Sequence, residues 1–180
     1  MTEPRRFHVD DTLRDGTAIT FRAVRPDDKA RIARAFAGLE RESVYTRFFT
    51  FKERLGDDEL AHLDHIDFVH EAVLVATRAA AGDEEVIASA RYIEHPTADG
   101  VRTAEVAFTV EEDYRGQGLA HRLLTHLATL ARAQGIAHFD ADVLADNGSM
   151  LAVFARCGFP VTRRRDGGAL HVTLDLLHPA

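Results

Sequence analysis

The sequence lacks most of the features that mark secreted, membrane-spanning or disulfide-linked proteins. Its single cysteine, Cys157, excludes an internal disulfide and fits a reducing compartment. No apolar segment follows the charged N-terminus, and no apolar run approaches the length that crosses a membrane. These absences predict a soluble cytoplasmic protein with no membrane partner.

Positive charge is also scarce. The 22 lysine and arginine residues are outnumbered by 29 aspartate and glutamate residues, which gives a net charge of −7. This balance argues against nucleic acid as a partner and weakly favours a cationic partner such as an amine. The 180 residues, 46% of them hydrophobic, are enough for one domain with its own core. We expect a polar, loosely held segment over residues 1–16 and a single domain over residues 17–180.

Two nucleotide-binding motifs are missing. The chain has no GxxxxGK[ST], and His121 stands where a dinucleotide fingerprint requires glycine. The stretch 104–124 instead predicts a strand, a glycine-bearing turn and a helix that ends near Gly135. Alternation along the strand gives an apolar face and a small, polar face that suits the wall of a cleft. The apolar face contains Ala104, Val106, Phe108 and Val110, and the helix carries the stripe Leu119, Leu123, Leu127 and Leu130.

The turn before this helix has the composition of an anion site. A helix N-terminus leaves backbone N–H groups unpaired and carries partial positive charge, which favours phosphate. Gly116 and Gly118 bring no side chain that would keep a ligand off the backbone, and Arg115 adds a positive charge. An ordinary turn with flexible residues is the alternative interpretation.

Two motifs in this order resemble the GCN5-related N-acetyltransferases. Arg115-x-x-Gly118-x-Ala120 is similar to the acetyl-coenzyme A signature of that family, and 147–159, NGSMLAVFARCGF, is similar to its second signature. The resemblance covers roughly residues 19–177. It implies a mixed α/β fold with a mostly antiparallel central sheet, a splayed parallel strand pair and flanking helices.

The resemblance also implies a coenzyme site without a metal. The pantetheine arm would lie between the two splayed strands and pair with the first of them, while the pyrophosphate would bind at the helix start. Carried over to this chain, the coenzyme-binding residues are Phe108, Thr109, Val110, Arg115, Gly116, Gln117, Gly118, Leu119, Ala120, Asn147 and Met150. A contact of 163–165, three arginines, with the ribose phosphate is left open, because a charged strand end is more often a solvated edge.

Glu105 is the candidate general base. It is the ionisable side chain in the middle of the central strand, and burial there would raise its pKa towards the working range. In the family, a glutamate in an Ala-Glu-[Val/Ile]-x-Phe context serves that role in lysine acetyltransferases, and residues 104–108 of this chain, AEVAF, match that context. The alternative is a strand carboxylate that faces solvent or pairs with Arg91 or Arg102.

The second signature departs from the family at one position. Many members have a tyrosine there that protonates the leaving thiolate, whereas this chain has Phe154. The thiolate would then leave unaided or take its proton from another donor such as water. Cys157 as an acyl carrier is a minor alternative to a packed cysteine.

Other segments predict the rest of the fold. Ser43-x-x-x-Arg47-Phe48-Phe49 and Ile66-Asp67-Phe68 resemble the bacterial protein-lysine acetyltransferases, although packing alone explains such aromatics equally well. His62 and His65 would share a helix face, which suggests either a metal site or ordinary surface histidines. We expect strands over 18–24, 73–81, 85–94, 103–111, 137–144, 161–165 and 169–174, and helices from Pro26, over 42–50, from Gly116 and from Asn147. The strands 103–111 and 137–144 should run parallel, because a helix separates them.

The sequence therefore predicts an acetyl-CoA-dependent N-acetyltransferase that transfers the acetyl group directly to an amine. A protein lysine is the favoured acceptor. A small-molecule amine or antibiotic is the rival acceptor, and a non-catalytic acyl-CoA sensor is the rival outside the enzymes. The oligomeric state is left open.

Overall fold

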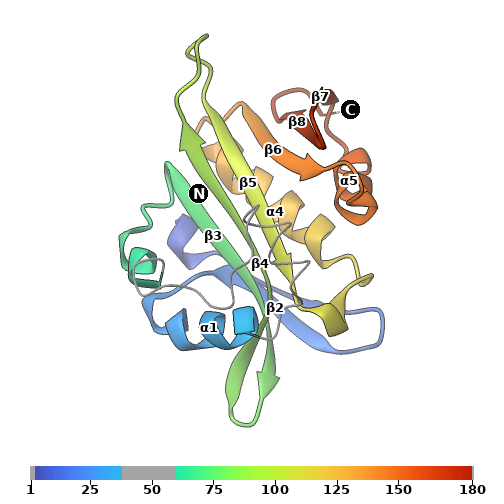
Figure 1. Cartoon of the computed structure of the whole chain (residues 1–180). Helices are drawn as coiled ribbons and strands as arrows, with labels where there is room; N and C mark the ends of the chain where they lie inside the picture. The colour runs from blue at the N-terminus through green and yellow to red at the C-terminus, as the bar shows by residue number, and fades with distance from the viewer. Residues whose placement is uncertain (1–2, 38–59, 180) are drawn as a thin grey trace.

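The computed structural model describes residues 3–37 and 60–179, which form one eight-stranded sheet with helices on both of its faces (Figure 1). The strands are β1 (His8–Thr12), β2 (Ala18–Ala23), β3 (Glu71–Ala80), β4 (Asp83–His95), β5 (Thr103–Val110), β6 (His138–Leu144), β7 (Val161–Asp166) and β8 (Ala169–Asp175). The helices are α1 (Lys29–Ala37), α4 (Leu119–Ala133) and α5 (Gly148–Ala155). Short 3-10 turns cover Pro4–Arg6, Pro26–Asp28, His62–His65 and Glu112–Tyr114.

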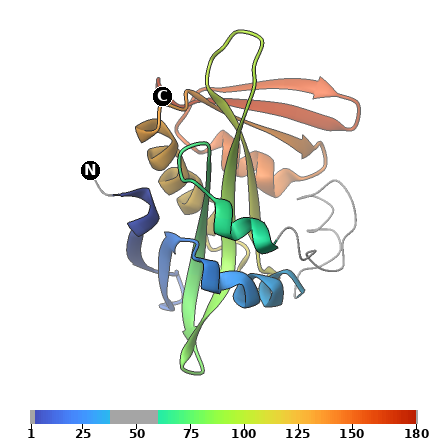
Figure 2. The same ribbon diagram turned by 90° about the vertical axis from the view of Figure 1, so that its left-hand side faces the viewer.

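The strand order is β1-β2-β3-β4-β5-β6-β8-β7. Neighbouring strands run antiparallel except for β5 and β6, which are parallel. The connection through α4 requires this direction, because a crossover helix returns the chain to the same end of the sheet. The β3–β4 hairpin and the β4–β5 connection protrude at opposite ends of the sheet (Figure 2). The mixed α/β fold and its single parallel pair confirm the architecture predicted from the sequence.

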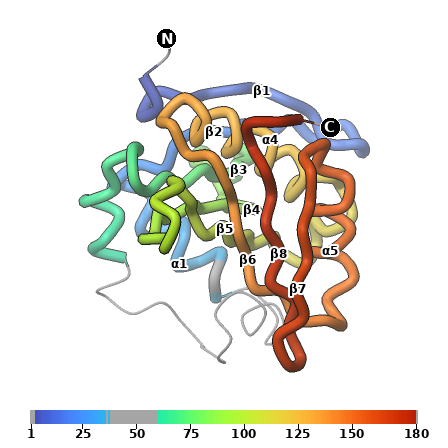
Figure 3. Tube along the Cα trace, turned by 90° about the horizontal axis from the view of Figure 1, so that it is seen from above, coloured from blue at the N-terminus to red at the C-terminus, as the bar shows by residue number. Residues whose placement is uncertain are grey.

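The two faces of the sheet are covered by different helices. Figure 3 shows α1 on one side of the sheet and α4 and α5 on the other. The leucine stripe of α4 is fully buried against the central strands, as its spacing predicts. The stripe consists of Leu119, Leu123, Leu127 and Leu130, each at most 8% exposed. On β5, Ala104 and Val106 are buried on the α4 side, so the alternation that predicted a core face is confirmed.

A buried ion pair fixes the start of α1 to the sheet. Arg22 of β2 and Asp28, which precedes α1, are 1% and 0% exposed and form two hydrogen bonds of 2.8 Å. Asp28 also accepts from the backbone N–H of Arg25 at 2.7 Å, and Glu84 of β4 accepts from Arg22 at 3.0 Å. Pro26 fits the start of this turn, since its missing N–H would be unpaired in any case. This network joins β2, β4 and α1.

The N-terminal segment corrects one expectation. Residues 8–12 were predicted to be loosely held, yet they form β1, which pairs antiparallel with β2 over five residue pairs. The reason is the partner strand, because an edge strand with polar residues on its outer face has little sequence signal of its own. The helix expected over 42–50 and the motif from Ser43 to Phe49 lie outside the described residues.

Candidate active site

The first component of the site is the point where β5 and β6 separate. Their pairing covers three residue pairs, from Thr103 with His138 to Glu105 with Asp140. Beyond Glu105, β5 continues to Val110 beside β4, while β6 continues beside β8. Figure 1 shows the two strands diverging towards their C-terminal ends. Among the described strands, none pairs with the outer half of β5 on this side.

The backbone groups on this unpaired side belong to alternate residues of β5. The N–H of Glu111 donates to Ile87 of β4 at 2.8 Å, and the carbonyl of Arg102 accepts from Ala137 on the β6 side at 2.8 Å. Because backbone direction alternates along a strand whose register with β4 is continuous, Phe108 and Val110 direct their N–H and C=O groups towards the unpaired side. The backbone of Thr109 is directed towards β4. Two residues of β5 therefore offer backbone hydrogen bonds to an extended ligand.

The second component is the turn before α4. Gly116 and Gly118 have φ angles of 76° and 79°, and a Cβ at either position would meet no atom within 4 Å. Backbone conformation, rather than space, therefore requires glycine here. Gly118 is the N-cap of α4, and no side chain caps the helix at this residue. The first turn of α4 therefore has no cap from its N-cap residue, which is the arrangement that suits an anion.

The third component is α5, which packs beside β5. Asn147 is the N-cap of this helix, and its side chain accepts from the N–H of Met150 at 3.2 Å. This bond gives the asparagine a structural role that does not depend on a ligand. Phe154 is 1% exposed and packs edge-on against Phe108, with ring centroids 6.2 Å apart. The position where many relatives have tyrosine is therefore an apolar contact between α5 and β5.

Glu105 lies where the two strands separate, but its environment differs from the one that the sequence predicts. The residue is exposed, so the burial that was expected to raise its pKa is not present. The side chain projects from the sheet face opposite α4 and α5, the face that Glu111 shares with α1. Of its two possible arginine partners, Arg102 forms a bidentate pair with Glu94, with both bonds at 2.7 Å.

A row of histidines and aspartates begins beside Glu105 and crosses this face of the sheet to β8. Asp140 of β6 is directly opposite Glu105 in the strand register. His95 of β4 reaches across to Asp140, with Nε2 at 2.9 and 3.1 Å from its two oxygens. His171 of β8 lies on the other side, with Nε2 at 3.7 Å from Asp140 and Nδ1 at 2.9 Å from Asp142. We refer to His95, Asp140, His171 and Asp142 as the His–Asp row.

The His–Asp row was not predicted from the sequence. Alternation in β6 places Asp140 and Asp142 on one face, and that much is readable from the sequence. The four residues come from three strands, however, and the sequence does not give the register between strands that are 45 residues apart. His95 also stands out electrostatically. Burial alone would lower its pKa, but hydrogen bonds with the Pro96 carbonyl and with Asp140, together with the charges of Asp140 and Glu105, raise it.

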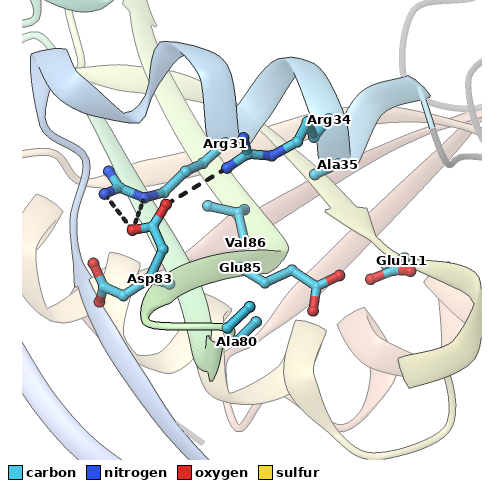
Figure 4. A pocket seen from close by; sticks show the side chains of 10 residues that line it. Arg31, Arg34, Ala35, Ala80, Asp83, Glu85, Val86 and Glu111 are labelled. Atoms are coloured by element: carbon cyan, nitrogen blue, oxygen red, sulfur yellow. Dashed lines mark hydrogen bonds and ion pairs between the residues drawn. The ribbon is translucent and has the colours of Figure 1, made fainter.

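A cavity of about 390 Å³ lies elsewhere, between α1 and the tip of the β3–β4 hairpin (Figure 4). Arg31 and Arg34 line it from α1, and Asp83 from β4 pairs with both of them at 2.8 and 3.7 Å. Glu111 lines the opposite wall. Because Glu111 is six residues along the chain from Glu105, about 20 Å at strand spacing, the cavity is distinct from the point where β5 and β6 separate.

The remaining sequence candidates have local roles. Asp67 accepts hydrogen bonds from the N–H groups of Val69, His70 and Glu71 at 2.8 to 3.1 Å, which explains an aspartate before β3. His62 pairs with Glu71, and the described residues contain no cluster of three or more potential metal ligands. Burial raises the pKa of the Cys157 thiol, which disfavours the thiolate that an acyl carrier needs. The arginines at 163–165 lie exposed on the edge strand β7.

Comparison with known proteins identifies the family of this arrangement. The model of the acetyltransferase (GNAT) family matches residues 40–159. The chain belongs to the GNAT family of acetyltransferases. The sequence signatures and the parallel strand pair agree with this family. None of the helices in residues 3–37 and 60–179 is both long and apolar enough to span a membrane.

Individual GNAT relatives cover nearly the whole chain. Acetyltransferase Pat of Mycolicibacterium smegmatis is 32% identical over 164 residues, which are 91% of this chain and 47% of that protein. Acetyltransferase PA5475 of Pseudomonas aeruginosa is 30% identical over 162 residues, which are 88% of this chain and 84% of that protein. The crystal structure of the GNAT domain of S. lividans PAT has a TM-score of 0.81 and 34% identity, covering 93% of this chain and 96% of that one. The chain thus spans about half the length of the M. smegmatis relative.

Proposed function

We propose that this protein transfers the acetyl group of acetyl-CoA to a lysine side chain of another protein, with Glu105 as the general base. The observation that carries the proposal is the position of Glu105. Its exposed carboxylate lies where β5 and β6 separate, at the start of the unpaired side of β5. GNAT acetyltransferases use acetyl-CoA, so the family supports the cosubstrate, while the assignments of individual residues and of the acceptor are proposals.

In this proposal the coenzyme extends along the unpaired side of β5. The turn from Arg115 to Ala120 would hold the pyrophosphate, because it combines a formal charge with the free N–H groups of a helix start. The backbone groups of Phe108 and Val110 would pair with the pantetheine amides as a neighbouring strand would. Thr109, whose backbone faces β4, would contribute its side chain. Asn147 and Met150 would line the other side from the start of α5.

The chemistry requires a base because an amine is protonated at neutral pH. With a reference pKa of about 10.4, roughly one lysine in a thousand is the free base near pH 7. Glu105 would accept the ammonium proton, directly or through water, as the nitrogen attacks the thioester carbonyl. The new C–N bond forms, the C–S bond breaks, coenzyme A leaves as a thiolate, and the amide nitrogen releases its second proton to water. A backbone N–H on the unpaired side of β5 would stabilise the oxyanion.

The leaving thiolate has no tyrosine beside it in this proposal. Phe154 occupies that position, and its ring is packed against Phe108. The thiolate would take its proton from water after it leaves. This step distinguishes the chain from relatives that have a tyrosine.

Three features support a protein as the acceptor. Glu105 is exposed, and its cross-strand neighbour Ile93 is 37% exposed, so the described residues leave this face open to a large substrate. The carboxylates of Asp140 and Asp142 suit a cationic segment. The similarity to the M. smegmatis Pat and the S. lividans PAT domain adds to the sequence resemblance to protein-lysine acetyltransferases. We place the activity in one domain over residues 17–180 of a cytoplasmic protein.

The test is incubation of the purified protein with labelled acetyl-CoA, a cell lysate and, separately, a panel of small amines. We expect label on lysine residues of proteins, identified by mass spectrometry. Label on small amines alone would assign the rival acceptor, and absence of label with normal coenzyme binding would assign a sensor.

A matched variant tests the base. Glu105→Gln keeps the shape of the side chain and should lower kcat by about 100-fold, within the usual range for a general base, without changing the affinity for acetyl-CoA. Asp166→Asn, an exposed carboxylate at the end of the edge strand β7, is the control and should retain most of the activity. Unchanged turnover in Glu105→Gln would remove Glu105 from the mechanism.

A further inference from the structure

The cavity between α1 and the β3–β4 hairpin lies apart from the proposed acetyl transfer. Its volume of about 390 Å³ falls within the range of ligand pockets, roughly 300–1,000 Å³. Short apolar side chains form part of its lining, and carboxylates form another part. The apolar residues include Ala35, Ala80 and Val86, and the acidic ones include Glu85 and Glu111. Such a lining suits a ligand with an aliphatic stem and a polar end.

Most of the charged groups that line the cavity already have partners. Both arginines of α1 are paired with Asp83, at 2.8 and 3.7 Å. Glu84 accepts from Arg22 of β2 at 3.0 Å. Glu85 accepts from Arg78 of β3 at 2.7 Å. A charged ligand would have to compete with these ion pairs, so they do not define a binding site by themselves.

Glu111 differs from these lining residues. Its Oε2 is buried, and no group in the described part of the chain donates a hydrogen bond to it. Figure 4 shows its carboxylate beside that of Glu85. Burial raises the pKa of Glu111, and the charges of Glu85 and Asp113 raise it further. Arg78 opposes this shift, although its hydrogen bond goes to Glu85. Glu111 therefore lacks both a hydrogen-bond donor and a cation of its own.

A primary ammonium group supplies what Glu111 lacks. It carries three N–H donors and a positive charge on a compact head, and an alkyl stem behind it is apolar. An anion would instead meet the carboxylates of Glu85 and Glu111, and an uncharged apolar molecule would leave Glu111 unpaired. A metal ion fits less well, since residues 3–37 and 60–179 contain no cluster of three or more potential metal ligands.

We propose that this cavity is a second binding site, which takes a primary alkylammonium group: the N–H groups donate to Glu111, and the methylene stem lies against Ala35, Ala80 and Val86. The site goes beyond the proposed acetyl transfer. Glu111 is six residues along β5 from Glu105, about 20 Å at strand spacing, so an ammonium bound there is out of reach of the proposed base. A lysine side chain of a protein and a free alkylamine carry the same group.

The test is a titration of the whole protein with n-butylammonium chloride, followed through the backbone amides by ¹H–¹⁵N NMR. We expect saturable shifts at Ala80, Ala81 and Val86, which line the cavity, whereas shifts at Glu105 would report the proposed active site. 1-Butanol has a similar stem without the charge and should give no saturable shift at the three cavity amides. The absence of saturation by n-butylammonium, or equal saturation by 1-butanol, would overturn the proposal.

Two variants separate the charge of the cavity from its space. Glu111→Gln keeps the shape of the side chain and should weaken n-butylammonium binding by about 10-fold or more, as expected for the loss of a charge-assisted hydrogen bond. Ala35→Leu keeps the carboxylate but fills the cavity and should abolish binding. Glu112→Gln, at the exposed next position, is the matched control and should bind as the wild type does. Thermal unfolding shows that each variant folds, and equal binding by folded Glu111→Gln would overturn the proposal.

A lysine blocked at both ends, Nα-acetyl-lysine N-methylamide, distinguishes the two sources of the ammonium group. Saturation of the cavity amides by this compound as well as by n-butylammonium would assign the site to lysine side chains of proteins. Saturation by n-butylammonium alone would assign it to free alkylamines. Glu105→Gln should leave these shifts unchanged, so a loss of turnover in that variant bears on the proposed base and not on the cavity.

Discussion

At the scale of single residues, the sequence predicts functional positions best where the backbone conformation favours a single residue type. Gly116 and Gly118 could be recognised because a positive φ is costly for every residue with a side chain, and the structure gives them φ angles of 76° and 79°. Glu105 could be recognised as a candidate from its place in an apolar strand. Its exposure could not be predicted, because exposure depends on which elements pack above that face of the sheet. The same limit concealed His95, whose partner Asp140 is 45 residues away.

Gly118→Glu tests the anion turn. A Cβ at this position meets no atom, so the protein should fold with a loss of about 1–2 kcal/mol from the left-handed backbone conformation. The new carboxylate would stand beside the pyrophosphate and should weaken acetyl-CoA binding by at least about 100-fold, measured by calorimetry, since like charges a few Å apart repel strongly.

Gly100→Glu is the matched control for this substitution. Gly100 also has a positive φ of 72° and an open surrounding, but it lies in the β4–β5 connection. The control should show the same loss of stability and normal coenzyme affinity. Equal binding by both variants would contradict the assignment of the α4 turn to the pyrophosphate.

At the scale of helices and strands, periodicity predicted what each segment forms but not what it pairs with. The central hairpin, the parallel strand and the leucine face of α4 are confirmed, because each has a clear period of 2 or 3.6 residues. The pairing of β1 with β2 and the placement of β8 between β6 and β7 were not predicted. Both depend on long-range contacts, which a local pattern does not contain. The point at which β5 and β6 stop pairing, at Glu105, also depends on long-range contacts and could not be predicted from the sequence.

Asp28 gives a prediction at this scale, because it joins α1 to two strands. Burial alone would raise its pKa, but hydrogen bonds from Arg22 and from the Arg25 backbone outweigh burial and lower the pKa below its ordinary value of 3.8. The ionised form therefore stabilises the fold above about pH 4, and this contribution is lost as the pH falls below 3.8 towards the lowered value. Asp28→Asn should reduce the free energy of unfolding by about 3 kcal/mol at pH 7, because it leaves a buried arginine less well paired.

Urea unfolding at several pH values checks this prediction. The difference between the wild type and Asp28→Asn should be largest near neutral pH and should narrow below pH 3.8. Asp27→Asn, whose side chain is 67% exposed in the same turn, should change the stability by less than about 1 kcal/mol. If the difference in the free energy of unfolding stayed constant at all pH values, the ionisation of Asp28 would not contribute to the stability of the fold.

At the scale of the whole molecule, the site is shared between the two halves of the sheet. One half, from β1 to β5, contributes Glu105, the backbone of Phe108 and Val110, and His95. The other half, from β6 to β8, contributes Asp140 and His171, and α5 lies beside it (Figure 3). The halves are joined along three residue pairs of β5 and β6 and through α4. A ligand that fills the unpaired side of β5 would therefore connect two parts of one molecule.

Acetyl-CoA should accordingly stabilise the whole fold. A ligand at 100 times its Kd that binds only the folded state adds about 2.7 kcal/mol, which for a chain of this size corresponds to a rise in Tm of about 5–10 °C. Differential scanning calorimetry with increasing acetyl-CoA measures the rise, which should continue with the logarithm of concentration. Coenzyme A should give a similar rise, since it retains the pyrophosphate and the pantetheine amides, whereas acetate should give none. Gly118→Glu should show a rise of no more than about 1–2 °C at the same concentrations, because a 100-fold weaker Kd leaves the ligand near its Kd. A rise of equal size in that variant would show that the coenzyme binds elsewhere on the molecule. The chain would then have the fold of the family without binding the pyrophosphate at the turn before α4.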